Sequence, residues 1–131
     1  MPNPKKLFSF APTHKSMQEI LKDHSLATLG DAYTNLIYSI YLSKKAGKPT
    51  GAKADSRILS DSLKQAGLRK FMASRVNRHQ QADAAEALLV YVWLQGLTTI
   101  TESVYTMTNC ENASEAFSSL LSDAKKKLSL E

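Results

Sequence analysis

The sequence contains a single cysteine, Cys110, among its 131 residues, and this scarcity excludes several kinds of architecture. One cysteine cannot form an internal disulfide or supply a zinc site that needs paired cysteines. It fits a reducing compartment. Long hydrophobic runs are also lacking, since the longest, Ala87–Leu94, has eight residues where a membrane span needs about 20. No apolar run of signal-peptide length follows the N-terminal lysines, so we expect a soluble, cytoplasmic protein without a membrane partner.

Proline is also scarce, and its four positions, 2, 4, 12 and 49, leave two long stretches uninterrupted. Neither stretch shows the alternating β-branched pattern of strands, and helix-forming residues dominate both. A hydrophobic content of 43% and a charged content of 22% are ordinary for a globular domain. We therefore predict an all-α fold, with a flexible tail over residues 1–12 and a single domain over residues 13–131.

Periodicity and capping residues predict the helix boundaries. The expected helices are His14–Lys22, Ser25–Lys44, a helix from an N-cap at Ser56 to about Ala66 before Gly67, Leu68–Arg78, Asp83–Leu97, and a last helix from an N-cap at Asn112 to about Leu128. The segment Thr98–Thr108 is rich in β-branched residues and is left open between helix and irregular structure.

The expected helix Ser25–Lys44 has an apolar stripe at the spacing of a buried helical face. Its members are Leu26, Leu29, Tyr33, Leu36, Ile37, Ile40 and Tyr41. Tyr38 and Leu42 form a second apolar flank, which one small bundle would leave uncovered. We expect a two-fold dimer to bury that flank.

The charge is unevenly distributed along the chain. The net charge is +5, but residues 1–79 hold 14 basic and 5 acidic side chains, whereas residues 80–131 hold 3 and 7. This basic excess favours a polyanionic partner such as RNA, DNA or an acidic membrane face, although basic domains without such partners are common. The candidate phosphate contacts are Lys44, Lys45, Lys48, Lys53, Arg69, Lys70, Arg75 and Arg78.

Three carboxylates are candidates for a metal site. Asp31 follows Gly30 inside the long helix, where a glycine costs about 1 kcal/mol unless a neighbour or ligand needs close approach. Asp83 and Glu86 are three residues apart and share one helical face. Bringing the three together would require a cation or shared protons, and oxygen ligands suit Mg²⁺, with Mn²⁺ as an alternative. In the other interpretation, Asp83 and Glu86 form a capping box and Asp31 faces solvent or a lysine.

Other catalytic patterns are lacking. The three histidines, His14, His24 and His79, are scattered, and Cys110 has no activating partner nearby in the sequence. The sequence contains neither a phosphate-binding glycine loop nor a dinucleotide fingerprint.

Two motifs carry a resemblance to a known family. The run Leu26–Ala32, LATLGDA, resembles the signature helix of ribonuclease III enzymes, and Ala82–Leu89, ADAAEALL, resembles their second acidic motif. The stretch Ser60–Leu68 between them is similar to the family's connecting helix. The resemblance covers about residues 25–94. It is strongest to the short members that consist of the nuclease domain alone, mini-ribonuclease III and archaeal ribonuclease III-like proteins. We accordingly expect no separate double-stranded-RNA-binding domain.

The resemblance implies a ribonuclease III-like helical bundle acting as a homodimeric endonuclease. Its implied substrate is double-stranded or structured RNA, with a ribosomal RNA precursor among the candidates, and its products carry 5′-phosphate and 3′-hydroxyl ends. Asp31, Asp83 and Glu86 match the family positions that bind Mg²⁺ and help to activate water, which makes them the implied catalytic and metal-binding residues.

Two positions depart from the family pattern. Ala27 stands where larger members have a glutamate, as it does in mini-ribonuclease III, and Thr28 replaces an aromatic residue that contacts the partner subunit. Ala27 favours an alternative function, a catalytically weak or inactive RNA-binding or ribosome-associated protein. A helical nucleotide pyrophosphatase is a third possibility, but its usual Glu-x-x-Glu pair is lacking.

Overall fold

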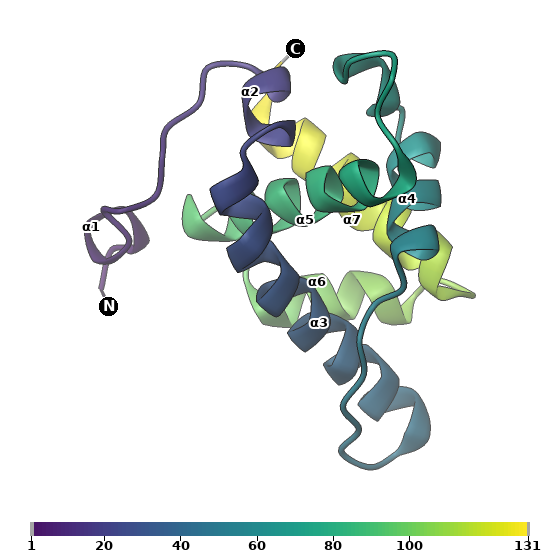
Figure 1. Cartoon of the computed structure of the whole chain (residues 1–131). Helices are drawn as coiled ribbons and strands as arrows, with labels where there is room; N and C mark the ends of the chain where they lie inside the picture. The colour runs from purple at the N-terminus through teal and green to yellow at the C-terminus, as the bar shows by residue number, and fades with distance from the viewer. Residues whose placement is uncertain (1, 131) are drawn as a thin grey trace.

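The computed structural model describes residues 2–130, and this part of the chain is helical without a β-strand, as predicted (Figure 1). The elements are α1 (Pro4–Leu7), α2 (Met17–Leu21), α3 (His24–Ala46), α4 (Ser56–Gln65), the 3₁₀ turn η1 (Arg69–Phe71), α5 (Arg78–Leu94), α6 (Ile100–Thr108) and α7 (Ala113–Leu128). No helix in residues 2–130 is both long enough and apolar enough to cross a membrane.

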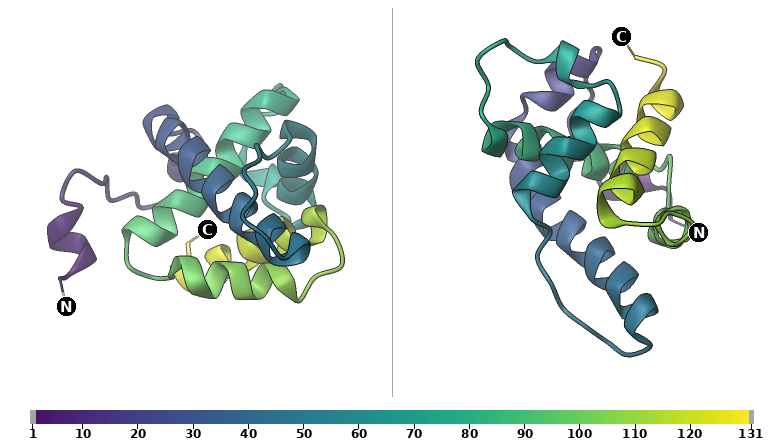
Figure 2. Two further views of the ribbon diagram at one scale, coloured as in Figure 1. Left: turned by 90° about the horizontal axis from the view of Figure 1, so that it is seen from below. Right: turned by 90° about the vertical axis from the view of Figure 1, so that its right-hand side faces the viewer.

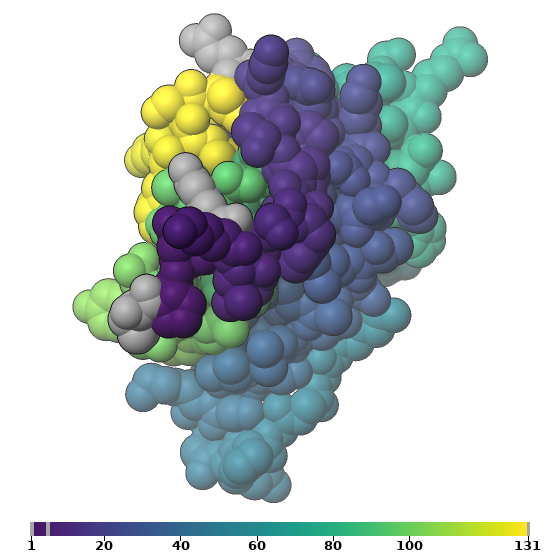
Figure 3. All heavy atoms as spheres, turned by 90° about the vertical axis from the view of Figure 1, so that its left-hand side faces the viewer, coloured from purple at the N-terminus to yellow at the C-terminus, as the bar shows by residue number. Residues whose placement is uncertain are grey.

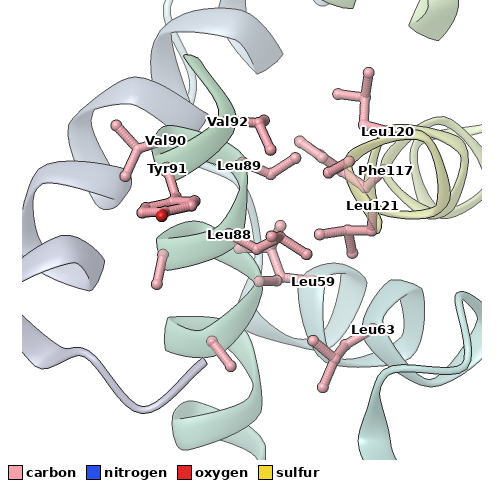
Figure 4. Close-up of a cluster of buried hydrophobic side chains, with 14 of the residues drawn as sticks. Leu59, Leu63, Leu88, Leu89, Val90, Tyr91, Val92, Phe117, Leu120 and Leu121 are labelled. Atoms are coloured by element: carbon pink, nitrogen blue, oxygen red, sulfur yellow. The ribbon is translucent and has the colours of Figure 1, made fainter. Parts of the chain in front are cut away.

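Helix α5 is the centre of the bundle, as its nearly uniform apolar composition predicts. Figure 4 shows Leu88 and Leu89 facing α4 and α7, while Val90 and Tyr91 lie on the opposite side of the helix. All four side chains are buried. Because α5 is enclosed on several sides, the side chains that it carries are fixed by the packing of the whole domain.

The closest helix crossing joins α3 to α5 at Gly30. A Cβ atom at Gly30 would overlap the backbone carbonyl oxygen of Glu86. The glycine therefore allows the two backbones to approach, which confirms the expectation that this interior glycine serves close packing. The crossing brings Asp31, the next residue of α3, towards the first half of α5.

Asn77 sets the start of α5 and corrects two expectations. Its Oδ1 accepts a hydrogen bond from the Gln80 backbone N–H at 2.8 Å, and the Gln80 side chain accepts one from the Asn77 N–H at 2.8 Å. This reciprocal capping box starts the helix at Arg78, five residues before the expected start. Asp83 is therefore not an N-cap, and the interpretation of Asp83 and Glu86 as a capping box is wrong.

The expected helix Leu68–Arg78 is also wrong, because only Arg69–Phe71 forms a 3₁₀ turn. The Arg69 guanidinium donates hydrogen bonds to the carbonyl oxygens of Ala73 and Ser74, each at 3.0 Å. These bonds hold residues 72–77 in an irregular path that ends at the Asn77 cap.

The remaining boundaries agree with expectation within a few residues. Asp55, and not Ser56, caps α4, since its Oδ1 accepts the Arg57 N–H at 2.7 Å. The segment left open forms α6, and Thr99 is its N-cap. Asn112 caps α7 as predicted.

The buried face of α3 is rotated relative to the predicted stripe. Leu26, Tyr33, Ile37 and Tyr41 are buried as expected, but the other three members are exposed: Leu29 by 40%, Leu36 by 49% and Ile40 by 37%. The expected free flank instead packs inwards, since Tyr38 and Leu42 contact the core. Apolar residues occur on both sides of α3, so the sequence alone could not show which side is buried.

The N-terminal segment lies along the outside of the bundle. Figure 3 shows it between α3 on one side and α6 and α7 on the other. The Phe8 ring lies 5.2 Å from that of Trp93 on α5, between ring centroids. Residues preceding the expected domain boundary therefore make aromatic contact with the bundle.

Candidate metal and RNA site

An open groove of about 670 Å³ lies where α3, the segment before α4, and α5 meet. Asp31 enters it from α3, and Asp83 and Glu86 enter it from successive turns of α5. The three candidate carboxylates therefore line one groove, although Asp31 is more than fifty residues away from the other two in the sequence. Lys53 is the only one of the candidate phosphate contacts that lines this groove, and its charge acts on Glu86.

Glu86 is the most perturbed acid in this groove. Its side chain is only 6% exposed. Burial, a hydrogen bond with the Asp31 carboxyl group and the negative charges of Asp31 and Asp83 raise the pKa of Glu86 to about 8, against a smaller opposing effect of Lys53. Glu86 consequently holds a proton at neutral pH when no cation is bound. The three acids thus lie close enough for the negative charges of Asp31 and Asp83 to disfavour ionisation of Glu86, as expected from the sequence.

Asn35 connects the Asp31 carboxylate to the segment that carries Lys53. Its Nδ2 donates to Asp31 Oδ1 at 3.2 Å, and its Oδ1 accepts the Ala54 backbone N–H at 2.7 Å. The Asn35 side-chain amide, one helical turn after Asp31, therefore holds both the Asp31 carboxylate and the backbone of the segment that carries Lys53.

Two serines continue this attachment along α3. Ser39 Oγ accepts the Ala52 N–H at 2.9 Å and donates to the Ala52 carbonyl at 3.0 Å. Ser43 Oγ accepts the Thr50 N–H at 2.8 Å. Asn35, Ser39 and Ser43 are spaced by four residues and so share one helical face. They hold residues 50–54, which we call the strap, against α3.

Sequence reasoning missed the two histidines of the groove. His24 lies at the start of α3 and His79 at the start of α5, and both line the groove with exposed side chains. The signal was helical phase: His79 is one turn before Asp83, and His24 is two turns before Asp31. His14 is elsewhere, with its Nε2 2.8 Å from Asp23 Oδ2.

The other predicted phosphate contacts lie outside the groove. Lys44, Lys45 and Lys48 are exposed at the far end of α3 and in the turn after it, which projects from the bundle in Figures 1 and 2. The segment with Arg75 and Arg78 lies at the opposite end of the molecule in the same views. The groove lies between these two basic regions.

Three of the predicted basic contacts have a partner within the fold, and one of them is Lys45, whose ammonium group lies 4.6 Å from the centroid of the Tyr41 ring. Arg69 is half-buried and holds the irregular segment through its two hydrogen bonds. The Lys70 ammonium lies 5.3 Å from the centroid of the Phe71 ring.

The donor set suits a hard cation by its chemistry. Asp31, Asp83 and Glu86 offer only carboxylate oxygens, the ligands that Mg²⁺ and Mn²⁺ prefer. As they stand, no three His, Cys, Asp or Glu side chains within residues 2–130 form a group that could hold a metal ion. Asp83 is exposed, however, and a rotation of its side chain costs little. Ala27, buried at the edge of the groove, contributes no ligand.

Fold and groove together define an all-helical domain with a carboxylate centre at the crossing of its two longest helices. The family model of ribonuclease III matches residues 24–129, and the chain belongs to this family. At the level of the family, the protein is therefore a ribonuclease-type enzyme, and the family generally uses a divalent metal. Comparison with curated proteins gives no match.

Proposed function

We propose that the protein is a metal-dependent endoribonuclease that cleaves double-stranded or structured RNA as a homodimer and leaves 5′-phosphate and 3′-hydroxyl ends. The observation that carries the proposal is the meeting of Asp31, Asp83 and Glu86 in one groove, which Lys53 also lines. The alternative explanation from sequence, a capping box, has been excluded by the Asn77 cap.

Asp31, Asp83 and Glu86 are the residues that would hold Mg²⁺ or Mn²⁺. A bound divalent cation lowers the pKa of water and stabilises negative charge on a phosphodiester. The raised pKa of Glu86 supports this assignment, since a carboxyl group destabilised by two neighbouring acids gains most from a positive charge. Glu86 would lose its proton on forming the site, so we expect cation affinity to rise with pH.

Lys53 would bind the phosphate group next to the carboxylates. The strap holds its backbone through the adjacent Ala54 N–H, which donates to Asn35. Its charge already acts on Glu86, whose pKa it lowers. In this arrangement Asn35 orients Asp31 and Lys53 relative to one another without contacting the substrate itself.

The basic regions on either side of the groove would contact the RNA backbone. Lys44, Lys45 and Lys48 belong to the projecting end of α3 and the turn after it, and Arg75 and Arg78 belong to the segment at the opposite end of the molecule in Figure 1. Contacts of this kind make affinity fall steeply with salt and recognise A-form geometry more than base sequence. We assign no phosphate contact to Arg69, because its guanidinium is engaged with the backbone.

A second copy of the chain would cover the exposed apolar face of α3. Leu29, Leu36 and Ile40 lie within a narrow arc of that helix and are each more than a third exposed. Burial of such a face stabilises a two-fold dimer. The dimer would present two grooves to the two strands of one duplex. Its proposed contact surface is the face with Leu29, Leu36 and Ile40, and not the Tyr38 and Leu42 flank expected from the sequence.

Incubation of an end-labelled RNA duplex with the protein tests the proposal. We expect cleavage of both strands with Mg²⁺ and none with EDTA, with products that carry 5′-phosphate ends. Asp83→Asn should abolish cleavage, whereas Asp61→Asn, an exposed acid of α4 outside the groove, should not. Cleavage that persists in EDTA, or in Asp83→Asn, would contradict the proposed site.

The second candidate function is a non-catalytic RNA-binding protein. Ala27 supports it, because this buried residue offers no fourth carboxylate at the edge of the groove. In that case the duplex would be bound in a salt-dependent manner without being cut, with Mg²⁺ or without it.

A further inference from the structure

A second cavity, of about 520 Å³, opens beside the carboxylate groove. It lies between α2, the start of α3, the irregular segment 72–77 and the start of α5. His24, Ala27 and Asp83 line both the cavity and the groove, so the two spaces adjoin at these residues. The volume lies in the range of small-ligand sites in proteins.

The lining of this cavity is apolar inside and polar at its rim. Leu21, Phe71 and Val76 contribute apolar surface, and Phe71 supplies an aromatic ring. Gln18 and Gln80 are exposed lining residues. The Gln18 amide can donate and accept hydrogen bonds, whereas Gln80 offers its NH₂ group, because its Oε1 already accepts the Asn77 N–H. This combination matches the recognition of unstacked bases, which stack on aromatic side chains and present donors and acceptors at their edges.

The charged side chains that line this cavity are of both signs, namely Lys22, Asp23 and Asp83, and two further lysines lie close to its aromatic ring. Lys22 lines it, and the ammonium groups of Lys70 and Lys125 lie 5.3 and 5.5 Å from the centroid of the Phe71 ring. The acid Asp23 is already engaged, since its Oδ1 accepts the Leu26 N–H and its Oδ2 pairs with His14. These two bonds hold the Asp23 carboxylate in place at the wall of the cavity.

Ala27 leaves the way between the two spaces open. Its side chain is a single methyl group, buried at the shared boundary. The irregular wall opposite is fixed by the Arg69 hydrogen bonds to Ala73 and Ser74. The cavity therefore has walls fixed by the fold and adjoins the groove in which the proposed function places a phosphodiester.

We propose that this cavity binds one unpaired nucleobase of an RNA duplex whose neighbouring phosphodiester lies in the carboxylate groove. The proposal rests on the proposed function, because the groove supplies the phosphodiester next to the base. It assigns a preference for structured RNA with a bulged or mismatched nucleotide over a perfect duplex.

Binding to two RNA duplexes tests the proposal without relying on cleavage. One duplex carries a single bulged 2-aminopurine, the other has the same sequence fully paired, and both carry a dye at a distant end and are titrated in EDTA. We expect the bulged duplex to bind roughly ten-fold more tightly, a difference typical of one base stacked on an aromatic side chain. The 2-aminopurine emission should change on binding.

Substitutions in the cavity should remove the preference for the bulged duplex without weakening binding of the paired duplex. Ala73→Trp, at an exposed position of the wall, fills the cavity. Phe71→Leu removes the ring and Gln18→Ala removes one amide at the rim. The matched control is Thr101→Trp, at an exposed position of α6 outside both spaces. Affinity for the paired duplex should stay unchanged in all of them, and their melting temperatures confirm that they fold.

The outcomes separate this inference from the proposed function. Equal binding of both duplexes by the wild type, or a preference that survives in Ala73→Trp and Gln18→Ala, overturns the base-binding cavity. If a duplex is nevertheless cleaved with Mg²⁺, the nuclease function stands. A preference that Ala73→Trp removes supports the cavity, even if neither duplex is cleaved with Mg²⁺ and the nuclease function fails. Failure to bind either duplex overturns both.

Discussion

Gly30 packs directly against the backbone of Glu86, and this contact places the acids of α3 and α5 in the same groove. A helix interior normally favours alanine over glycine. Here the missing side chain lets Asp31, one residue along α3, reach the carboxyl group of Glu86 and raise its pKa. Packing and electrostatics at the site thus have a common origin in one helix crossing.

Replacement of Gly30 by alanine should therefore destabilise the protein, against the usual helix preference. The added Cβ would meet the Glu86 carbonyl, which is backbone and cannot rotate away. We expect a loss of about 1–3 kcal/mol, typical of an overpacked core, seen as a melting temperature lower by several degrees. Ala32→Gly, on the exposed face of the same helix, should cost about 1 kcal/mol through propensity alone. A higher melting temperature for Gly30→Ala would contradict the close crossing.

The stability of the metal-free protein should fall as the pH rises from about 5 to 8. The pKa of Glu86 is about 8 in the folded state, above its ordinary value of 4.5, so the folded protein keeps a proton that the unfolded chain has lost. The stabilisation of the folded state by this proton is complete below pH 4.5, the ordinary pKa of the group, and disappears as the pH rises towards the folded-state pKa of about 8. Each pKa unit corresponds to about 1.4 kcal/mol, so the loss is on the order of a few kcal/mol.

Glu86→Gln isolates this effect, because glutamine resembles the protonated acid and cannot titrate. Its unfolding free energy, measured by urea titration in EDTA, should depend less on pH than that of the wild type and exceed it at pH 8. Parallel curves for the two proteins would show that Glu86 ionises normally.

Mg²⁺ or Mn²⁺ should raise the melting temperature, because a ligand that binds only the folded state stabilises it. At a concentration 100 times the dissociation constant the gain is about 2.7 kcal/mol. Asp83→Asn should remove most of this gain and should also stabilise the metal-free protein by relieving repulsion on Glu86. Asp61→Asn serves as the control acid. Equal metal-induced shifts in the wild type and in Asp83→Asn would exclude Asp83 as a ligand.

Lys53→Ala should weaken RNA binding and reduce its dependence on salt by about one phosphate contact. It should also move the Glu86 pKa upwards, because Lys53 lowers it in the wild type. Electrophoretic mobility shifts from about 50 to 200 mM salt measure the first effect. Lys64→Ala removes an equal charge from the end of α4, outside the groove, and should leave the salt slope closer to that of the wild type. Identical slopes for the two variants would show that Lys53 has no special role.

Leu36→Glu should convert a dimer into a monomer. Leu36 is 49% exposed in the middle of the apolar face of α3, so a charge there would be buried in the dimer contact. Light scattering at micromolar concentration should change from about twice the 14.5 kDa chain mass to the chain mass. Tyr105→Glu, which replaces an exposed aromatic residue of α6, is the control. A wild type that is already monomeric would refute the homodimer.

The sequence motifs indicated which acids line the groove better than they indicated which surfaces of α3 are buried. Asp31 and Glu86 belong to short local motifs, and the cost of Gly30 within a helix indicated a close neighbour. The buried face of α3 is decided by how α5 crosses it, which the sequence does not show. Leu36 and Ile37 are adjacent and both apolar, so periodicity placed both of them in the core, whereas Leu36 is exposed.

The strap could not be predicted for a different reason. Lys53 reaches the groove only because Asn35, Ser39 and Ser43 hold the chain against α3, and such long-range bonds have no periodic signature. The start of α5 was misplaced because two capping patterns compete within ten residues, and the Asn77 pattern has the better geometry.

The aromatic contact at the N-terminal segment gives the protein an optical reporter. Trp93 is the sole tryptophan of the chain. Its ring lies 5.2 Å from that of Phe8 and 5.3 Å from that of Tyr33, two residues beyond Asp31 on α3. Tryptophan emission of the protein therefore comes from a single residue, placed between the N-terminal segment and the helix that carries Asp31. Undocking of that segment would expose the indole to water and shift its emission to longer wavelength, without any label.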